Sequence, residues 1–176
     1  EGVLKDAPGA PAGIKRLRSL GGALWAAAEN GTYRFTGNAW VRVDEKPFVD
    51  FCFHLGQVHG ATREDIFRFE SGKFVNIKPA GGYLENDTTV IMEDGTQVLT
   101  DPVEIAPVER IASYSGTLYL LRHGGLALLE GKTFVENPVD WGMMPSRVTR
   151  DMLALGSRLF VATDRGVAVL RGMAFT

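Results

Sequence analysis

The stretch LWAAAENGTYRFTGNAW occupies residues 24–40 and returns three times without a gap. The later copies are VHGATREDIFRFESGKF (58–74), LYLLRHGGLALLEGKTF (118–134) and LFVATDRGVAVLRGMAF (159–175). Each copy opens on an aliphatic residue, has a ring in second place and a turn residue in eighth place, and closes on a large aromatic. Self-similarity at a spacing of a few tens of residues is the signature of a repeat architecture, so these copies decide the fold.

Turn residues divide each copy and its flanks into short strands. Around the first copy, the segments 14–20, 23–29, 32–36 and 39–43 are predicted strands, and glycine-containing turns separate them. Four strands joined by tight turns form an antiparallel meander, and no helical periodicity interrupts the pattern. Meanders repeated radially make a β-propeller, because each small sheet covers its neighbour. The sequence therefore predicts an all-β fold, a β-propeller of four-stranded antiparallel meanders.

Five units follow a lead-in segment, 1–13. Their predicted ranges are 14–44, 49–79, 80–107, 108–138 and 148–176. The third is inferred from 88–104 (TTVIMEDGTQVLTDPVE), which keeps a mid-repeat glycine and a strand but lacks the rings. Five small blades could close a ring alone, or the chain could form part of a larger ring of about seven or eight blades, completed by further blades or by another chain. We expect the larger ring, because residue 176 falls inside the last strand of the final unit.

The rings that recur in phase are expected to be buried between or within blades. They are Trp25, Tyr119 and Phe160 in second place and Trp40, Phe74, Phe134 and Phe175 in last place. Truncation of Phe160 to alanine should then cost about 3–5 kcal/mol, as for a core aromatic. His59 shares the column of Trp25 and is expected to pack between blades. His54 lies in an innermost strand, where it faces either the channel or the core.

The copies resemble the two-component regulator propeller repeat, whose consensus runs roughly Leu-Trp-hydrophobic-Gly-Thr-x-x-Gly-Leu before an aromatic strand. LFVATDRGVAVL (159–170) and LYLLRHGGLALL (118–129) carry the resemblance best. The Gly-Thr pair of the consensus is altered, to Ala27-Ala28, Ala61-Thr62 and Ala162-Thr163. The resemblance implies a propeller in a sensor-like or carbohydrate-associated module outside the cytoplasm, periplasmic or secreted. It implies no particular activity, because one fold hosts many functions.

Composition excludes several classes of partner. A net charge of -2 and a pI near 5.9 give no electrostatic basis for binding nucleic acid or an anionic membrane. No stretch is long and apolar enough to insert into a bilayer. The single cysteine, Cys52, lies in an apolar run and reads as a small buried hydrophobe. No phosphate loop, metal-ligand spacing or nucleophile elbow is present, so no cofactor, metal site or catalytic residue is predicted.

A ligand site is expected on the face where the hairpin loops between second and third strands meet the crossovers between blades. Rings that stack on sugar faces and arginines that bind acidic groups lie in these loops. The candidate ligand-binding residues are Arg63, Tyr83, His123, Trp141, Arg147 and Arg165. The favoured alternative is that Trp141 and its neighbours Met143 and Met144 cap a gap between blades. The partner suggested by these residue types is a glycan or a small acidic ligand.

Three functions are consistent with this pattern. The first is a non-catalytic ligand-binding or sensor-like propeller. The second is a propeller enzyme of the lyase type acting on an acidic polysaccharide, with His123, Tyr83 and an arginine as base, acid and carboxylate neutraliser. The third is a structural surface for protein interaction, which would have no affinity for glycans.

Overall fold

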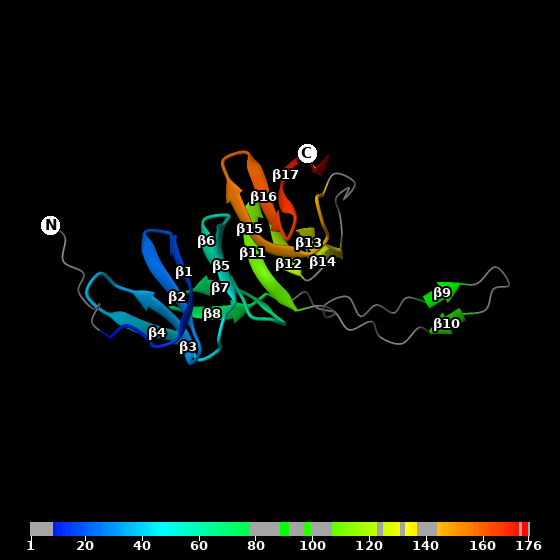
Figure 1. The fold of residues 1–176 in the computed structure, drawn as a ribbon. Coiled ribbons are helices and arrows are strands. Elements are labelled where there is room, and N and C mark those ends of the chain that lie inside the picture. The colour runs from blue at the N-terminus through cyan, green and yellow to red at the C-terminus, as the bar shows by residue number, and fades with distance from the viewer. Residues whose placement is uncertain are drawn as a thin grey trace.

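A computed structural model describes residues 9–77, 89–91, 97–99, 107–122, 125–130, 133–136, 144–172 and 174–175 of the chain. Strands and turns make up this part of the molecule, and it contains no helix that could cross a membrane. Four four-stranded antiparallel sheets are present, each with its strands in sequence order. This arrangement confirms the predicted all-β meander fold (Figure 1).

The four sheets are named blades I to IV in chain order. Blade I consists of β1 (Ile14–Leu20), β2 (Ala23–Ala28), β3 (Gly31–Phe35) and β4 (Trp40–Asp44). Blade II consists of β5 (Asp50–His54), β6 (Gln57–Ala61), β7 (Ile66–Glu70) and β8 (Lys73–Asn76). Blade III consists of β11 (Val108–Tyr114), β12 (Thr117–Arg122), β13 (Gly125–Glu130) and β14 (Thr133–Glu136). Blade IV consists of β15 (Thr149–Leu155), β16 (Arg158–Thr163), β17 (Gly166–Arg171) and β18 (Ala174–Phe175).

The first strand of each blade contacts the first strand of the next. These contacts join β1 to β5, β5 to β11 and β11 to β15, so the four first strands are the innermost strands of the array. Each blade has one face toward the preceding blade, here called its leading face, and one toward the following blade, its trailing face. The blades therefore succeed one another radially, as in a propeller.

Most of the unit predicted for 80–107, between blades II and III, lies outside the described residues. Its described part contains β9 (Thr89–Ile91) and β10 (Gln97–Leu99), which form a two-stranded sheet. Figure 1 shows this hairpin apart from the four blades. Because β5 contacts β11 directly, blades II and III are neighbours with no sheet between them. Residues 88–104 carry no aromatic ring, whereas rings fill the space between the neighbouring blades I and II.

The core lies between successive blades, where the ring in second place of the first and third copies packs on the next blade. Trp25 of blade I contacts Phe51, Phe69 and Phe74 of blade II, with ring centroids 6.3, 4.8 and 5.8 Å away. Tyr119 of blade III belongs to a cluster that includes blade IV residues such as Leu159. Trailing-face rings therefore fill the space between blades.

The expected burial of the recurrent rings holds for most but not all of them. Trp25, Tyr119, Phe74 and Phe175 are buried, and the side chain of Phe134 lies outside the described residues. Phe160 and Trp40 are only half-buried, contrary to expectation. Phe160 lies on the trailing face of blade IV and Trp40 on blade I, the two ends of the described array, where no described blade covers them.

Gly60 illustrates why small residues occupy the second strand of blade II. A Cβ atom at this position would collide with the rings of Phe48 and Phe51. Without it, these two rings stack at 5.6 Å with an interplanar angle of 28°. The close approach explains a glycine in the interior of a strand that is otherwise well packed.

Two buried histidines lie where blade II meets blade III. The His54 and His59 rings are 5.2 Å apart, and His54 Nδ1 lies 2.9 Å from Ser113 Oγ of β11. His59 Nδ1 lies 3.2 Å from the carbonyl oxygen of Gln57. His59 is thus an interblade packing residue, as expected, and His54 faces the blade interface. Burial lowers the pKa of both imidazoles, that of His59 to about 4.

This histidine pair predicts that the chain loses stability in mildly acidic solution. The unfolded chain takes up a proton on each imidazole near pH 6.5, whereas folded His59 stays neutral down to about pH 4. Stability is therefore complete above pH 6.5 and falls between pH 6.5 and 4. We expect a loss of about 2 kcal/mol at pH 5 relative to pH 7 from His59, measured by denaturant unfolding. The variant His59→Phe, which has an aromatic ring at this place as in the other copies, should lose less unfolding free energy between pH 7 and pH 5. Equal stability of the wild type at the two pH values would contradict this prediction.

Candidate functional site

Each innermost strand carries a charged residue at the same place in the repeat. These residues are Arg16, Asp50, Arg110 and Asp151, each eight positions before the first residue of its copy. They pair across the sheet with equivalent residues of the second strands: Ala27, Ala61, Leu121 and Ala162. In β1, β11 and β15 the strand register shifts immediately before the charged residue. Such bulges re-aim a side chain, which here brings the charges together at the centre of the array.

The four charges alternate in sign around the channel and contact one another. Arg16 Nε lies 3.7 Å from Asp50 Oδ1, and Arg110 Nε donates a 2.7 Å hydrogen bond to Asp151 Oδ1. Arg16 Nη1 also lies 3.9 Å from Asp151 Oδ2, and this ion pair joins β1 to β15 across the channel. We call Arg16, Asp50, Arg110 and Asp151 the channel quartet.

Asp50 is the centre of this network. Its carboxylate has no exposed surface and accepts two hydrogen bonds from Arg18, at 2.9 Å from Nε and 3.1 Å from Nη2. It also accepts a 3.4 Å hydrogen bond from the backbone N–H of Ile111 in the next blade. Burial acts to lower the pKa of Arg18, but the hydrogen bonds to Asp50 outweigh it and the pKa is raised. Asp50 therefore binds β1, β5 and β11 together.

Asp151 and Arg16 are less completely satisfied. Burial favours the protonated form of Asp151, but hydrogen bonds from the Met152 N–H and from Arg110 outweigh it and lower the pKa. Burial lowers the pKa of Arg16, partly offset by Asp50. Arg16 Nε is buried and has no hydrogen-bond acceptor. A buried donor without a partner is costly, so Arg16 is prepared to donate to an acceptor that enters the channel.

Arg16 and Arg110 of the channel quartet also line a groove on the face formed by the hairpin loops. The groove has a volume of about 820 Å³, and a hollow of about 330 Å³ adjoins it and shares Val49, Arg63 and Arg110 with it. Six basic residues line the two together: Lys15, Arg16, Lys46, Arg63, Arg110 and Arg150. Four acidic residues accompany them: Glu29, Glu64, Asp65 and Glu109. The lining is thus more basic than the chain as a whole, whose net charge is -2.

Some of these cations are already neutralised. Lys15 Nζ lies 2.7 Å from Glu29 Oε1, and Lys46 Nζ lies 3.7 Å from Asp44 Oδ1. Arg63 is exposed, and its side chain has no acidic partner among the described residues. Its backbone carbonyl accepts a 2.8 Å hydrogen bond from the N–H of Val108, which fixes the loop beside blade III. Arg63 thus presents a guanidinium at the junction of the two hollows that has no acidic partner in the described part of the chain.

The predicted site residues fall into three groups. Arg63 lines the groove. Arg147 and Arg165 are exposed at the same end of blade IV, where Asp164 N–H bonds to the carbonyl of Val148, but neither lines the groove. Tyr83, His123 and Trp141 lie outside the described residues, as do the unit boundaries near them.

Sequence reasoning missed the channel quartet and the lysines. The gapless copies begin at the second strand of each unit and so do not include the first strands. Extending each copy by eight residues toward the N-terminus aligns Arg16, Asp50, Arg110 and Asp151, and this alignment would have found them. Lys15 has a basic counterpart in Arg150, nine positions before its copy, but Val49 and Glu109 at this place break the pattern. Lys46 lies in a crossover outside the copies.

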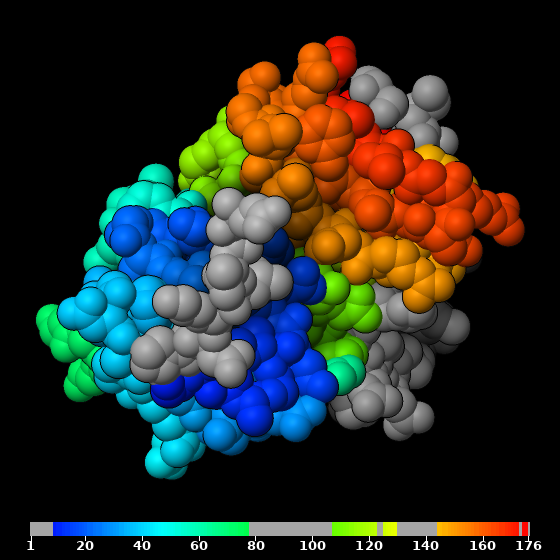
Figure 2. Space-filling model, turned by 60° about the vertical axis from the view of Figure 1, so that its left-hand side comes forward, coloured from blue at the N-terminus to red at the C-terminus, as the bar shows by residue number. Residues whose placement is uncertain are grey.

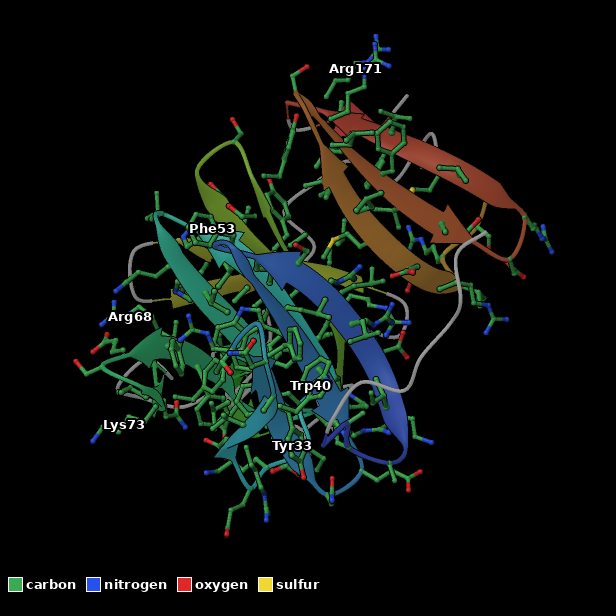
Figure 3. All side chains as sticks on the ribbon, turned by 90° about the vertical axis from the view of Figure 1, so that its left-hand side faces the viewer. Tyr33, Trp40, Phe53, Arg68, Lys73 and Arg171 are labelled. Atoms are coloured by element: carbon green, nitrogen blue, oxygen red, sulfur yellow. The ribbon has the colours of Figure 1, made fainter. Side chains whose placement is uncertain are left out.

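The opposite ends of the innermost strands enclose a second, mainly apolar hollow of about 330 Å³, whose lining includes Phe51, Phe53 and Met152. Figure 3 shows Phe53 near this end of the molecule. No group of three or more metal-ligating side chains occurs in the part of the chain that the structure describes. Cys52 is buried, and burial raises the pKa of its thiol, which fits a packing role.

Comparisons with known proteins address the fold. No protein-family model matches the sequence, and no curated protein matches it. Solved structures do match, among them the extracellular domain of the one-component system BT4673 from B. thetaiotaomicron, at 16% identity and a TM-score of 0.53. That alignment covers 94% of this chain and 28% of the other. A second structure, titled as YCF48 bound to D1 peptide, aligns at 14% identity with a TM-score of 0.53, covering 99% of this chain and 55% of that one.

These neighbours settle the fold and leave the activity open. The chain spans about a quarter of the length of the BT4673 domain and a little over half of YCF48. At this identity the likeness concerns the fold alone. The neighbours confirm, at the level of the fold, the resemblance to the two-component regulator propeller. The chain is therefore similar in fold to the β-propellers found in extracellular domains of two-component systems.

Proposed function

We propose that this chain is a non-catalytic, sensor-like propeller module that binds an acidic ligand in the groove above the channel quartet. One observation carries the proposal: the groove combines an excess of basic side chains with a buried Arg16 Nε that lacks a hydrogen-bond acceptor. A carboxylate supplies acceptors in the geometry that guanidinium groups bind best. The neighbouring extracellular domains of two-component systems support a sensor-like role and a place outside the cytoplasm.

The preferred ligand class is a carboxylate-bearing sugar. The groove contains apolar surface from Pro47, Phe48 and Val49 beside the cations Arg63 and Lys46. An apolar wall can pack against the face of a sugar ring while a cation binds its acidic group. An acidic peptide offers the same carboxylate, and the YCF48 structure shows that a propeller can be solved with a peptide bound.

The test compares acidic and neutral ligands on one protein. Titration calorimetry with oligogalacturonate should detect binding, and neutral galacto-oligosaccharide of equal length should bind much more weakly. The substitution Arg63→Ala should weaken binding of the acidic oligosaccharide about tenfold or more, because it removes a charge-assisted hydrogen bond. Arg165→Ala is the matched control, an exposed hairpin arginine outside the groove, and should leave the affinity unchanged.

Two outcomes would reject this function. One is equal affinity for the acidic and neutral oligosaccharides, and the other is an equal effect of the Arg63 and Arg165 substitutions. A third measurement addresses the lyase alternative: cleavage by elimination creates an unsaturated sugar that absorbs in the near ultraviolet. Growth of that absorbance on incubation with oligogalacturonate would replace the binding proposal by the enzymatic one.

A further inference from the structure

The trailing face of blade IV has the composition of a blade interface but is exposed. In ninth place of the copies, Thr32, Ile66 and Leu126 are completely buried on the trailing faces of blades I to III. The equivalent residue of blade IV, Val167, is 60% exposed. Phe160, in second place, is half-buried, whereas its counterparts on the other blades are buried. Figure 2 shows a broad surface of blade IV, coloured orange to red, that no described blade covers.

The leading face of blade I shows the same exposure at the other end of the array. In the innermost strands, Phe51, Ile111 and Met152 face the preceding blade and are buried. Leu17, at the same place in blade I, is 49% exposed. Tyr33 and Trp40 lie farther out on this blade and are half-buried (Figure 3). The leading face of blade I thus resembles one side of the three interfaces between successive blades, but no described blade packs against it.

The signs of the channel quartet show which blade fits on blade IV. From blade I to blade IV, arginine and aspartate alternate at this place of the innermost strands. The order is Arg16, Asp50, Arg110, Asp151. The strand that follows Asp151 should therefore carry an arginine at this place. Blade I carries one, Arg16. Asp151 already contacts Arg110 at 2.7 Å and Arg16 of its own chain at 3.9 Å, but its side chain retains 49% exposure, which leaves room for a third basic neighbour.

We propose that the trailing face of blade IV binds the leading face of blade I of a second copy, so that two copies close one ring. Each copy then contributes a blade I and a blade IV, and two equivalent junctions form. Apolar residues exposed in the single chain, Val167 and Leu17 among them, become buried there. The alternation of arginine and aspartate continues without a break around the channel. Burial of both apolar faces supplies the driving force.

The experiment is sedimentation equilibrium of the 176-residue chain at micromolar concentration. The wild type should be a dimer. Val167→Arg and Leu17→Arg each introduce an unpaired charge into both junctions and should weaken dimerisation on the order of a hundredfold. Both positions are largely exposed in the single chain, so neither substitution should prevent folding. Leu55→Arg is the control, because Leu55 is 77% exposed in a turn on neither face, and should leave the dimer intact.

Mixing the two variants gives the sharpest readout. A heterodimer of Val167→Arg and Leu17→Arg has one junction with both substitutions and one with neither. The mixture should therefore associate more strongly than either variant alone. A monomeric wild type at all concentrations would overturn the proposal and leave the face to a different blade. A dimer that neither substitution weakens would also overturn it.

Discussion

Replacing Asp50 by asparagine is expected to lower the free energy of unfolding by about 3–5 kcal/mol. The carboxylate has no exposed surface and accepts hydrogen bonds from Arg18 and from the Ile111 N–H, while Arg16 lies 3.7 Å away. Asparagine keeps the shape but removes the charge, so two partly buried guanidinium groups lose their counter-ion. Breaking a buried pair in this way costs more than the pair contributes, because the remaining charge stays buried.

Asp151→Asn is the matched control for this prediction. Asp151 occupies the same place in the repeat and accepts a 2.7 Å hydrogen bond from Arg110, but half of its side chain is exposed. Solvent can replace the lost interaction, so we expect a loss of about 1 kcal/mol or less. Chemical denaturation of both variants at pH 7 measures the difference. Equal losses would show that the channel is open to solvent at both positions.

Truncating Trp25 to alanine is expected to cost about 3–5 kcal/mol. The indole packs among three phenylalanine rings of blade II, and its N–H donates a 3.2 Å hydrogen bond to the carbonyl of Leu20. Removing it leaves a cavity between blades I and II that no neighbouring side chain is free to fill.

Phe160→Ala serves as the comparison, because Phe160 has the same place in its copy but is half-buried. Its truncation should cost less than about 2 kcal/mol in the single chain, below the 3–5 kcal/mol that its recurrence in the sequence suggests. Thermal or denaturant unfolding at a concentration where the chain is monomeric measures both. A cost for Phe160→Ala equal to that for Trp25→Ala would show that another part of the chain covers blade IV.

The blades could be predicted well from the sequence because the residues that recur in the repeat are those that fill the space between sheets. The strand at 14–20 was predicted to the residue, since the Gly21-Gly22 turn ends it. The prediction that Phe160 is buried was wrong. The repeat shows that this side chain is suited to an interface between blades, but it does not show whether a following blade is present. The unit at 80–107 was expected from one glycine and one strand, features that do not specify interblade rings.

The candidate site was less predictable. Arg63 could be identified because hairpin loops have recognisable positions in the repeat. The direction in which the channel quartet side chains point depends on bulges in the innermost strands. A bulge shifts the strand register, and no residue type in this sequence marks its position. The groove joins residues from the start of β1, the crossover before β5 and the hairpin after β6. Only the radial arrangement of blades brings these separated segments together.

The innermost strands of blades II and III lie side by side at one charged channel, with no blade between them. A nuclear Overhauser effect between the imidazole protons of His54 and the β protons of Ser113 tests this most directly. The two side chains are 59 residues apart in sequence and 2.9 Å apart between Nδ1 and Oγ. We predict a strong cross-peak. Absence of that peak, with His54 showing contacts to residues 80–107 in its place, would contradict the arrangement.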